Sequence, residues 1–81
     1  MPTVFRHKGY RFFFYSNEGI PPEPLHIHVR KGEQVAKIWL EPEIVVDHSY
    51  GMKSAELKEL CAIVADNKQL IREFWNEHFN D

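Results

Sequence analysis

Two histidines separated by one residue are the side chains best placed to do chemistry: His26 and His28, in the run PEPLHIHV at residues 22–29. On a β-strand alternate side chains share a face, so the two imidazoles would lie roughly 6–7 Å apart at the backbone. Histidine titrates near neutral pH, which suits general acid–base cleavage of a phosphodiester. If the protein is an enzyme, we predict a metal-independent ribonuclease with His26 and His28 as its acid–base pair.

Two other interpretations of this histidine pair stay open. A metal ion could take both imidazoles, but it would need further ligands, for which Glu23, His7 or His48 are candidates. Nothing in the spacing demands such a site, so we assign no metal ligand and expect no cofactor. Alternatively, both histidines are polar residues on the solvent side of a hairpin.

The elements that carry the histidines are predicted to be two β-hairpins. In the first, aromatic and β-branched residues over 3–16 flank Lys8-Gly9, which fits a two-residue turn. This register pairs His7 with Tyr10, Phe5 with Phe12 and Thr3 with Phe14. One face would then carry Phe5, Tyr10, Phe12 and Phe14, and the other Val4, Arg6, Arg11, Phe13 and Tyr15.

A proline-rich loop over 17–24 separates this hairpin from the second, whose strands are residues 25–29 and 34–40. Lys31-Gly32 is the expected turn, which pairs His28 with Val35 and His26 with Lys37. Strand alternation then gives a core face and a polar face. The core face holds Leu25, Ile27, Val29, Ala36, Ile38 and Leu40; the polar face holds His26, His28, Arg30, Lys37 and Trp39.

The rest of the chain is predicted to be mainly helical. Residues 43–46 form a short fifth strand and residues 48–51 a turn or linker. Ser54 is the expected N-cap, with Glu56 in the first turn. Apolar residues then recur at helical spacing to about residue 79, with Asp66-Asn67 as the point where the helix could break. The fold class is α+β: a mainly antiparallel sheet made from two hairpins (residues 1–50), packed on one long helix (54–79), in a single domain of 81 residues.

If both hairpins join one sheet, the face away from the helix gathers cations and aromatic rings. Cations would hold phosphates and rings would stack on bases, as in single-stranded RNA binding. The predicted RNA contacts are Arg6, Arg11, Tyr15, Arg30, Lys37 and Trp39. The alternative is a protein interface, either with a partner or across a homodimer, in which the edge strand Thr3–His7 pairs with another copy.

Charge and composition limit the remaining classes of function. The net charge is −2, divided into +1 over residues 1–53 and −3 over residues 54–81. A typical DNA-binding domain is strongly basic, so any nucleic-acid contact would depend on a local patch. No apolar run approaches the roughly 20 residues of a membrane span. Cys61 has no partner for an internal disulfide, and we expect a cytoplasmic protein with a packed, reduced thiol.

Several motifs together resemble those of a small bacterial family known as domain of unknown function 4160. They are GYRFFFYSNEG at residues 9–19, Pro21-Pro22, HIHV at 26–29, AKIWL at 36–40 and FWNEHF at 74–79. Members are similar in size to toxin–antitoxin components and are often encoded beside another small domain, which implies a partner protein from a neighbouring gene. The resemblance therefore favours a toxin–antitoxin-type component that binds or cleaves RNA. It identifies no catalytic residue.

Overall fold

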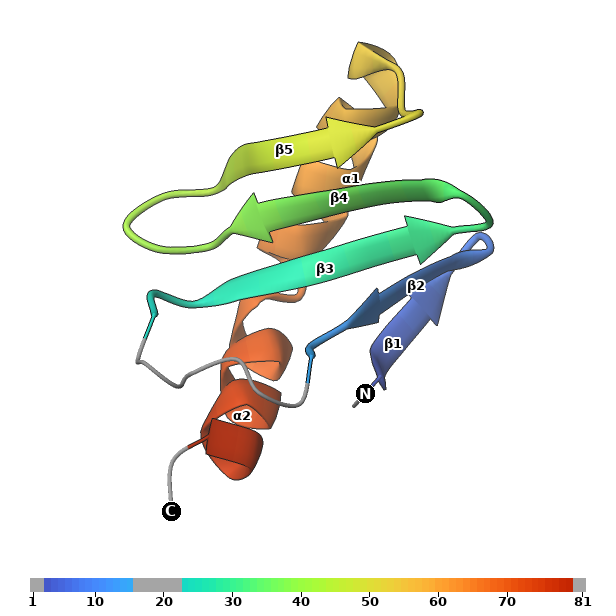
Figure 1. Cartoon of the computed structure of the whole chain (residues 1–81). Coiled ribbons are helices and arrows are strands. Elements are labelled where there is room, and N and C mark those ends of the chain that lie inside the picture. Colours follow the sequence, from blue (N-terminus) through green and yellow to red (C-terminus); the bar gives the residue numbers. More distant parts are fainter. Residues whose placement is uncertain (1–2, 16–22, 80–81) are drawn as a thin grey trace.

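The computed structural model of the protein describes residues 3–15 and 23–79. Five antiparallel strands form one sheet in which neighbours in sequence are neighbours in space. The strands are β1 (Thr3–His7), β2 (Tyr10–Phe13), β3 (His26–Lys31), β4 (Gln34–Trp39) and β5 (Val45–Tyr50). Figure 1 shows the two C-terminal helices on one side of this sheet. The predicted α+β class and antiparallel sheet are confirmed, and both hairpins belong to the same sheet.

The first hairpin turns at Lys8-Gly9, as predicted. Both residues have positive φ (50° and 84°), which a type I′ turn requires. The pairs His7–Tyr10 and Phe5–Phe12 are confirmed, but Thr3 lies opposite Phe13 rather than Phe14 because the register shifts between Thr3 and Phe5. The same shift explains why Val4, which we expected on the polar face, is buried in the core under the helices.

The second hairpin turns one residue later than predicted, at Gly32-Glu33. Gly32, with φ of 62°, occupies the first turn position, where glycine accepts a left-handed backbone at no steric cost. His28 therefore lies opposite Lys37 and His26 opposite Trp39, so both predicted pairs were wrong. The register differs by two residues. An even displacement leaves each side chain on its predicted face.

The fifth strand also lies later than predicted. It runs over residues 45–50, so the segment expected to be a turn at His48–Tyr50 is a strand. Most of its residues are exposed, because it forms one edge of the sheet. A strand without apolar alternation gives no period-2 signal to detect. The register shifts between Lys37 and Ile38, which lie opposite His48 and Val46, so Asp47 is the extra residue of a β-bulge.

Two helices replace the single long helix of the prediction: α1 (Ser54–Asp66) and α2 (Lys68–Phe79). They meet at Asn67, whose side-chain Nδ2 donates to the carbonyl of Ile63 at 2.8 Å. The N-cap is Lys53 and not Ser54; its backbone N–H donates to Glu56 Oε1 at 3.2 Å. Glu56 is in the first turn, where a carboxylate favours the helix dipole, as expected.

The core lies between the helices and one face of the sheet. α1 contacts β5 and α2 contacts β1, so the helix pair covers the sheet from one edge to the other. The buried apolar residues are Val4, Phe12, Phe14, Leu25, Ile27, Val29, Ala36, Ile38, Leu40, Leu60, Val64, Ile71 and Trp75. Every predicted core residue of the second hairpin is among them. The opposite face of the sheet, called the open face below, carries the predicted site residues other than His26, which is buried against Trp75 of α2.

The proline-rich loop was assigned to 17–24, and residues 17–22 lie outside the described part of the chain. In the described part, neither helix has the length and apolar character needed to cross a membrane.

Candidate nucleic-acid interface

Three arginines form a row across the open face. Arg6 on β1 lies opposite Arg11 on β2, and Arg11 lies opposite Arg30 on β3. Neighbouring strands are roughly 5 Å apart, so the three side chains leave the sheet side by side. We call Arg6, Arg11 and Arg30 the arginine row. The sequence predicted these residues as phosphate contacts, and the predicted register of the first hairpin already placed Arg6 opposite Arg11. The pairing of Arg11 with Arg30 was not predicted.

Contacts within the sheet orient two members of the arginine row. The Arg11 guanidinium carbon lies 4.3 Å from the centre of the Phe13 ring, and Arg11 Nε donates to Thr3 Oγ1 at 3.0 Å. Arg30 Nε donates to the Gly32 carbonyl at 3.0 Å. Each of these bonds uses Nε rather than a terminal guanidinium nitrogen, which leaves the terminal nitrogens as donors for an anion.

The arginine row has no acidic partner among residues 3–15 and 23–79. The ion pairs found there join Lys8 to Glu59, Lys37 to Glu23, His48 to Asp47 and Arg72 to Glu41. Like charges directly opposite one another destabilise a sheet. The row therefore costs folding stability, and a bound anion would offset that cost.

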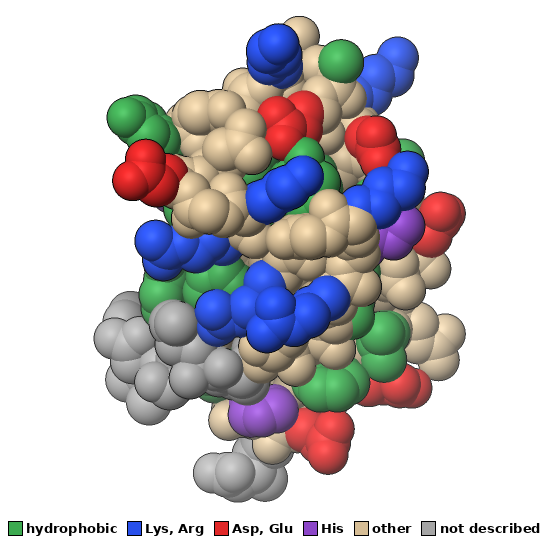
Figure 2. Space-filling model, turned by 90° about the vertical axis from the view of Figure 1, so that its right-hand side faces the viewer, with side chains coloured by type: hydrophobic (Ala, Val, Ile, Leu, Met, Phe, Trp, Pro, Cys, Tyr) green, Lys and Arg blue, Asp and Glu red, His purple; other side chains and the backbone are tan. Residues whose placement is uncertain are grey.

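Basic side chains also gather at the hairpin turns next to the arginine row. Figure 2 views the side of the molecule where both turns lie and shows Lys and Arg side chains there. Lys31 Nζ lies 4.9 Å from the Tyr10 ring centre, and Lys8 Nζ lies 3.5 Å from Glu59 Oε2. Positive charge thus extends from the arginine row on the open face to Lys31 and Lys8 at the end of the sheet where the hairpins turn.

Two aromatic residues of the open face were predicted to stack on bases. Tyr15 is 40% exposed, and its ring packs edge-on against His28 at 4.6 Å between ring centres. Trp39 is half-buried. Its ring lies 4.4 Å from Lys37 Nζ, and its Nε1 donates to Asp47 Oδ1 at 3.0 Å. Trp39 pairs with His26, four residues along β3 from Arg30, so its ring lies toward the opposite end of the face from the arginine row. Tyr15 packs against Phe13 and His28. Phe13 is only 2% exposed and lies beneath the Arg11 guanidinium.

Lys37 is less available than the arginines. Its side chain is 16% exposed, and Nζ lies 3.6 Å from Glu23 Oε1 as well as over the Trp39 ring. An anion would have to displace this carboxylate. Of the predicted cations, Lys37 therefore carries the weakest case for direct phosphate contact.

The structure separates the two predicted acid–base histidines by their burial. His26 is fully buried: its Nδ1 lies 3.0 Å from the Pro24 carbonyl, and its ring packs edge-on against Trp39 and Trp75. His28 is half-buried, with its ring centre 5.2 Å from that of His26. A general base must reach the proton that it removes. Of the pair, only His28 borders solvent.

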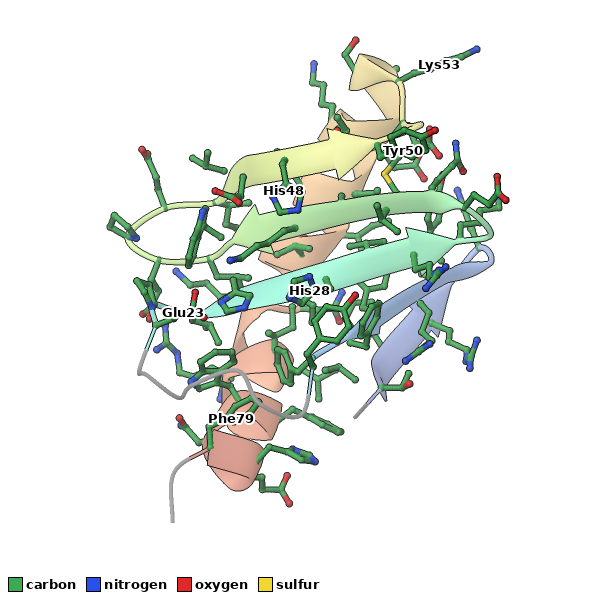
Figure 3. All side chains as sticks on the ribbon, in the orientation of Figure 1. Glu23, His28, His48, Tyr50, Lys53 and Phe79 are labelled. Atoms are coloured by element: carbon green, nitrogen blue, oxygen red, sulfur yellow. The ribbon has the colours of Figure 1, made fainter. Side chains whose placement is uncertain are left out.

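Sequence reasoning missed Asp47 as a member of the site and gave His48 only a minor role. Asp47 accepts from Trp39 Nε1 and lies 2.7 Å, through Oδ2, from His48 Nδ1. These two hydrogen bonds hold the pKa of the Asp47 carboxyl below its usual value of 3.8. His48 lies opposite Lys37, in the same cross-strand row as His28 (Figure 3). No sequence signal marks the bulge that brings these groups together.

Neither a metal nor a reactive cysteine gains support from the geometry. Within residues 3–15 and 23–79, no three or more His, Cys, Asp or Glu side chains are grouped so that they could hold a metal ion. Cys61 is half-buried against the core, and burial raises the pKa of its thiol. A raised pKa disfavours the thiolate, which is the nucleophilic form.

With this geometry established, comparison with known proteins identifies the family. The family model described as Domain of unknown function (DUF4160) matches residues 9–76. The chain belongs to the DUF4160 family. The match covers β2 through most of α2, whereas β1, which carries Arg6, lies outside it. No curated protein and no solved structure matches the chain.

Proposed function

We propose that this DUF4160 protein binds single-stranded RNA on the open face of its sheet. The arginine row is the observation that carries the proposal. Three guanidinium groups on adjacent strands, without acidic partners among the described residues, form a polyanion-binding surface at a cost to stability. Arginine presents planar paired donors that match phosphate oxygens.

The aromatic rings farther along the open face support binding of a single strand rather than a duplex. Unpaired bases can stack on exposed aromatic side chains, each worth about 1–3 kcal/mol in single-strand binding. Tyr15 and Trp39 lie on the same face as the arginines, with Tyr15 partly exposed. In this arrangement phosphates contact the arginines while bases contact the rings.

The charge distribution supports one orientation of binding. Residues 54–81, which include both helices, carry a net charge of −3. This charge repels a polyanion from the helical side. RNA would therefore approach the open face, and binding would depend strongly on salt because phosphate contacts release counterions.

The direct test is fluorescence anisotropy of a labelled single-stranded RNA with purified protein over a series of salt concentrations. The expected result is binding whose log affinity falls linearly with log salt, at a slope of about −0.7 for each phosphate contact. A double-stranded RNA of the same sequence serves as control and binds more weakly. Absence of salt-sensitive RNA binding would contradict the proposal.

We further propose that the protein acts as a toxin–antitoxin-type component in the cytoplasm, with a partner encoded by a neighbouring gene. Support comes from the arginine row and from membership of the DUF4160 family. Induction of the wild-type protein should arrest growth of a bacterial host, and an Arg6→Gln/Arg30→Gln variant should not. Arrest that persists in the folded variant would separate toxicity from the open face.

A protein-interaction module is the second candidate function. It rests on β5, an edge strand that exposes Val45 (46%) and Tyr50 (71%). An exposed edge can pair with the edge of another chain. Sedimentation of the wild type and of Tyr50→Lys tests this candidate: a dimer lost in the variant supports it, and a monomer at all concentrations removes it.

A further inference from the structure

The β-bulge at Asp47 creates an oriented histidine on the open face. In an unbroken strand, consecutive side chains point to opposite faces. At this bulge, Asp47 Oδ1 reaches Trp39 Nε1 at 3.0 Å while Oδ2 reaches His48 Nδ1 at 2.7 Å. One carboxylate thus connects β4 to a histidine on the neighbouring edge strand. Bulges often lie next to active sites, where they re-aim a side chain.

The hydrogen bond decides which nitrogen of His48 carries a proton. An ionised carboxylate can only accept hydrogen bonds, so Nδ1 must be the donor. In a neutral imidazole this leaves Nε2 with a lone pair. The His48 side chain is 65% exposed, so Nε2 is accessible to a substrate. An aspartate that fixes the tautomer and orientation of a histidine is the arrangement used by general bases in hydrolases.

His48 faces a second histidine across one strand. His28 on β3 lies opposite Lys37 on β4, and Lys37 lies opposite His48 on β5. Figure 3 shows His28 and His48 on the same side of the sheet. Both contribute to the wall of a depression of about 140 Å³, together with Phe13, Tyr15 and Val35. Strands two apart are roughly 10 Å apart, so a phosphate group in this depression would lie within reach of both imidazoles. Lys37 lies between the two histidines in the row, and its Nζ is 4.4 Å from the centre of the Trp39 ring and 3.6 Å from Glu23 Oε1.

We propose that His48, positioned by Asp47, and His28 form an acid–base pair that cleaves RNA on the open face. This inference rests on the RNA binding proposed above. His48 Nε2 removes the proton of a ribose 2′-hydroxyl, and the 2′-oxygen attacks the adjacent phosphorus. The new P–O2′ bond forms as the P–O5′ bond breaks, and protonated His28 donates a proton to the departing 5′-oxygen. The products are a 2′,3′-cyclic phosphate and a 5′-hydroxyl.

This step needs no oxidant, reductant or further reactant, because one proton is taken and one is given. Asp47 is a positioning residue, since it touches His48 and not the substrate. The titratable groups around His48 on this face are Asp47 on β5, Lys37 on β4, His28 on β3 and Tyr15 after β2. The arginine row lies on the next row of the same sheet and would hold the flanking phosphates.

The test incubates end-labelled single-stranded RNA with purified protein in the presence of a metal chelator. The wild type should cut the RNA and leave a 2′,3′-cyclic phosphate. His48→Gln and His28→Gln should each lower the rate by about 100-fold or more, the usual share of an acid–base group. His78→Gln, an exposed histidine on α2, is the matched control and should cleave at the wild-type rate.

Further measurements separate chemistry from binding and from structure. In His48→Gln the RNA affinity should fall far less than the cleavage rate, and an RNA with a 2′-deoxy sugar at the cleavage site should bind without being cut. Asp47→Asn should displace the acid limb of the rate–pH profile, which a purely structural change would leave in place. A wild-type protein that binds RNA but leaves it intact would overturn this inference alone. A protein that does not bind RNA would overturn the proposed function as well.

Discussion

Asp47 Oδ2 lies 2.7 Å from His48 Nδ1, although the two residues are consecutive on a β-strand. The register shift opposite Lys37 and Ile38 makes this contact, because it removes the strict alternation of faces at Asp47. The sheet edge thereby acquires a histidine with a defined tautomer. The same carboxylate accepts from Trp39, so the histidine, the bulge and the aromatic ring are connected.

The first prediction concerns the acid titration of Asp47. Hydrogen bonds from Trp39 and His48 lower its pKa in the folded protein, so their stabilising contribution is present above the usual value of 3.8 and is lost as pH falls through the lower folded value. The indole Nε1–H resonance of Trp39 should therefore shift with a midpoint below pH 3.8. Asp47→Asn should abolish this pH-dependent shift of the Trp39 resonance. A midpoint at or above 3.8 in the wild type would show that the contact is absent in solution.

The second prediction separates the roles of two histidines by stability. His26 is fully buried among aromatic rings, so His26→Ala leaves a cavity and removes a buried hydrogen bond to the Pro24 carbonyl. We expect a loss of about 2–4 kcal/mol in the free energy of unfolding, measured by urea denaturation. His48→Gln, at an exposed position, should stay within about 0.5 kcal/mol of the wild type. Equal losses for both variants would contradict the assigned burial.

The third prediction concerns the arginine row. Arg6→Gln removes one member that has no acidic partner among the described residues and that faces Arg11. The magnitude of the salt slope of RNA binding should fall by about 0.7, the share of one phosphate contact on a single strand. The unfolding midpoint should not decrease, because a like-charge neighbour is removed. Lys58→Gln, on the exposed face of α1, is the control and should leave the salt slope unchanged. If Arg6→Gln and Lys58→Gln changed the salt slope equally, RNA binding would depend on the total charge of the protein and not on the arginine row.

The fourth prediction uses the contact between the first hairpin and α1. Tyr10 Oη donates to Glu56 Oε2, and this bond raises the pKa of Tyr10 from 10.0 to about 12. The protonated phenol is favoured in the folded state, so the contribution to stability is complete below pH 10 and is lost as pH rises to about 12. Denaturation midpoints over this range should fall less in Tyr10→Phe than in the wild type.

Tyr50→Phe changes an exposed tyrosine and serves as the control for the alkaline experiment. It should show the same pH dependence as the wild type. If Tyr10→Phe behaves identically to Tyr50→Phe, the Tyr10–Glu56 bond does not stabilise the protein.

Side-chain alternation made much of this fold predictable. Ile27, Val29, Ala36 and Ile38 were assigned to the core from a period of two, and they are buried there even though the hairpin register was wrong by two residues. Turn positions were less predictable, because Lys31-Gly32 and Gly32-Glu33 both offer a glycine. In the structure Gly32 is the first residue of the turn and has a positive φ. The sequence alone does not show which of the two turn positions this glycine takes.

The site was predictable as a set of residues but not as an arrangement. Arg6, Arg11 and Arg30 were expected on the open face, yet their alignment depends on how β2 pairs with β3, which two separate hairpins do not specify. His48 was assigned to a turn because β5 is a polar edge strand. Bulges add one residue to a strand without a compositional mark, so the contact between Asp47 and His48 was not predictable from sequence.

Amide chemical-shift mapping by NMR during titration with a short single-stranded RNA tests the open face most directly. If RNA binds as proposed, the perturbed amides belong to Arg11, His28, Arg30 and Lys37 and to their strand neighbours, while α1 and α2 stay unchanged. The perturbations should also diminish as salt is raised. Shifts concentrated on the helices, or none at all, would contradict RNA binding by this face of the sheet.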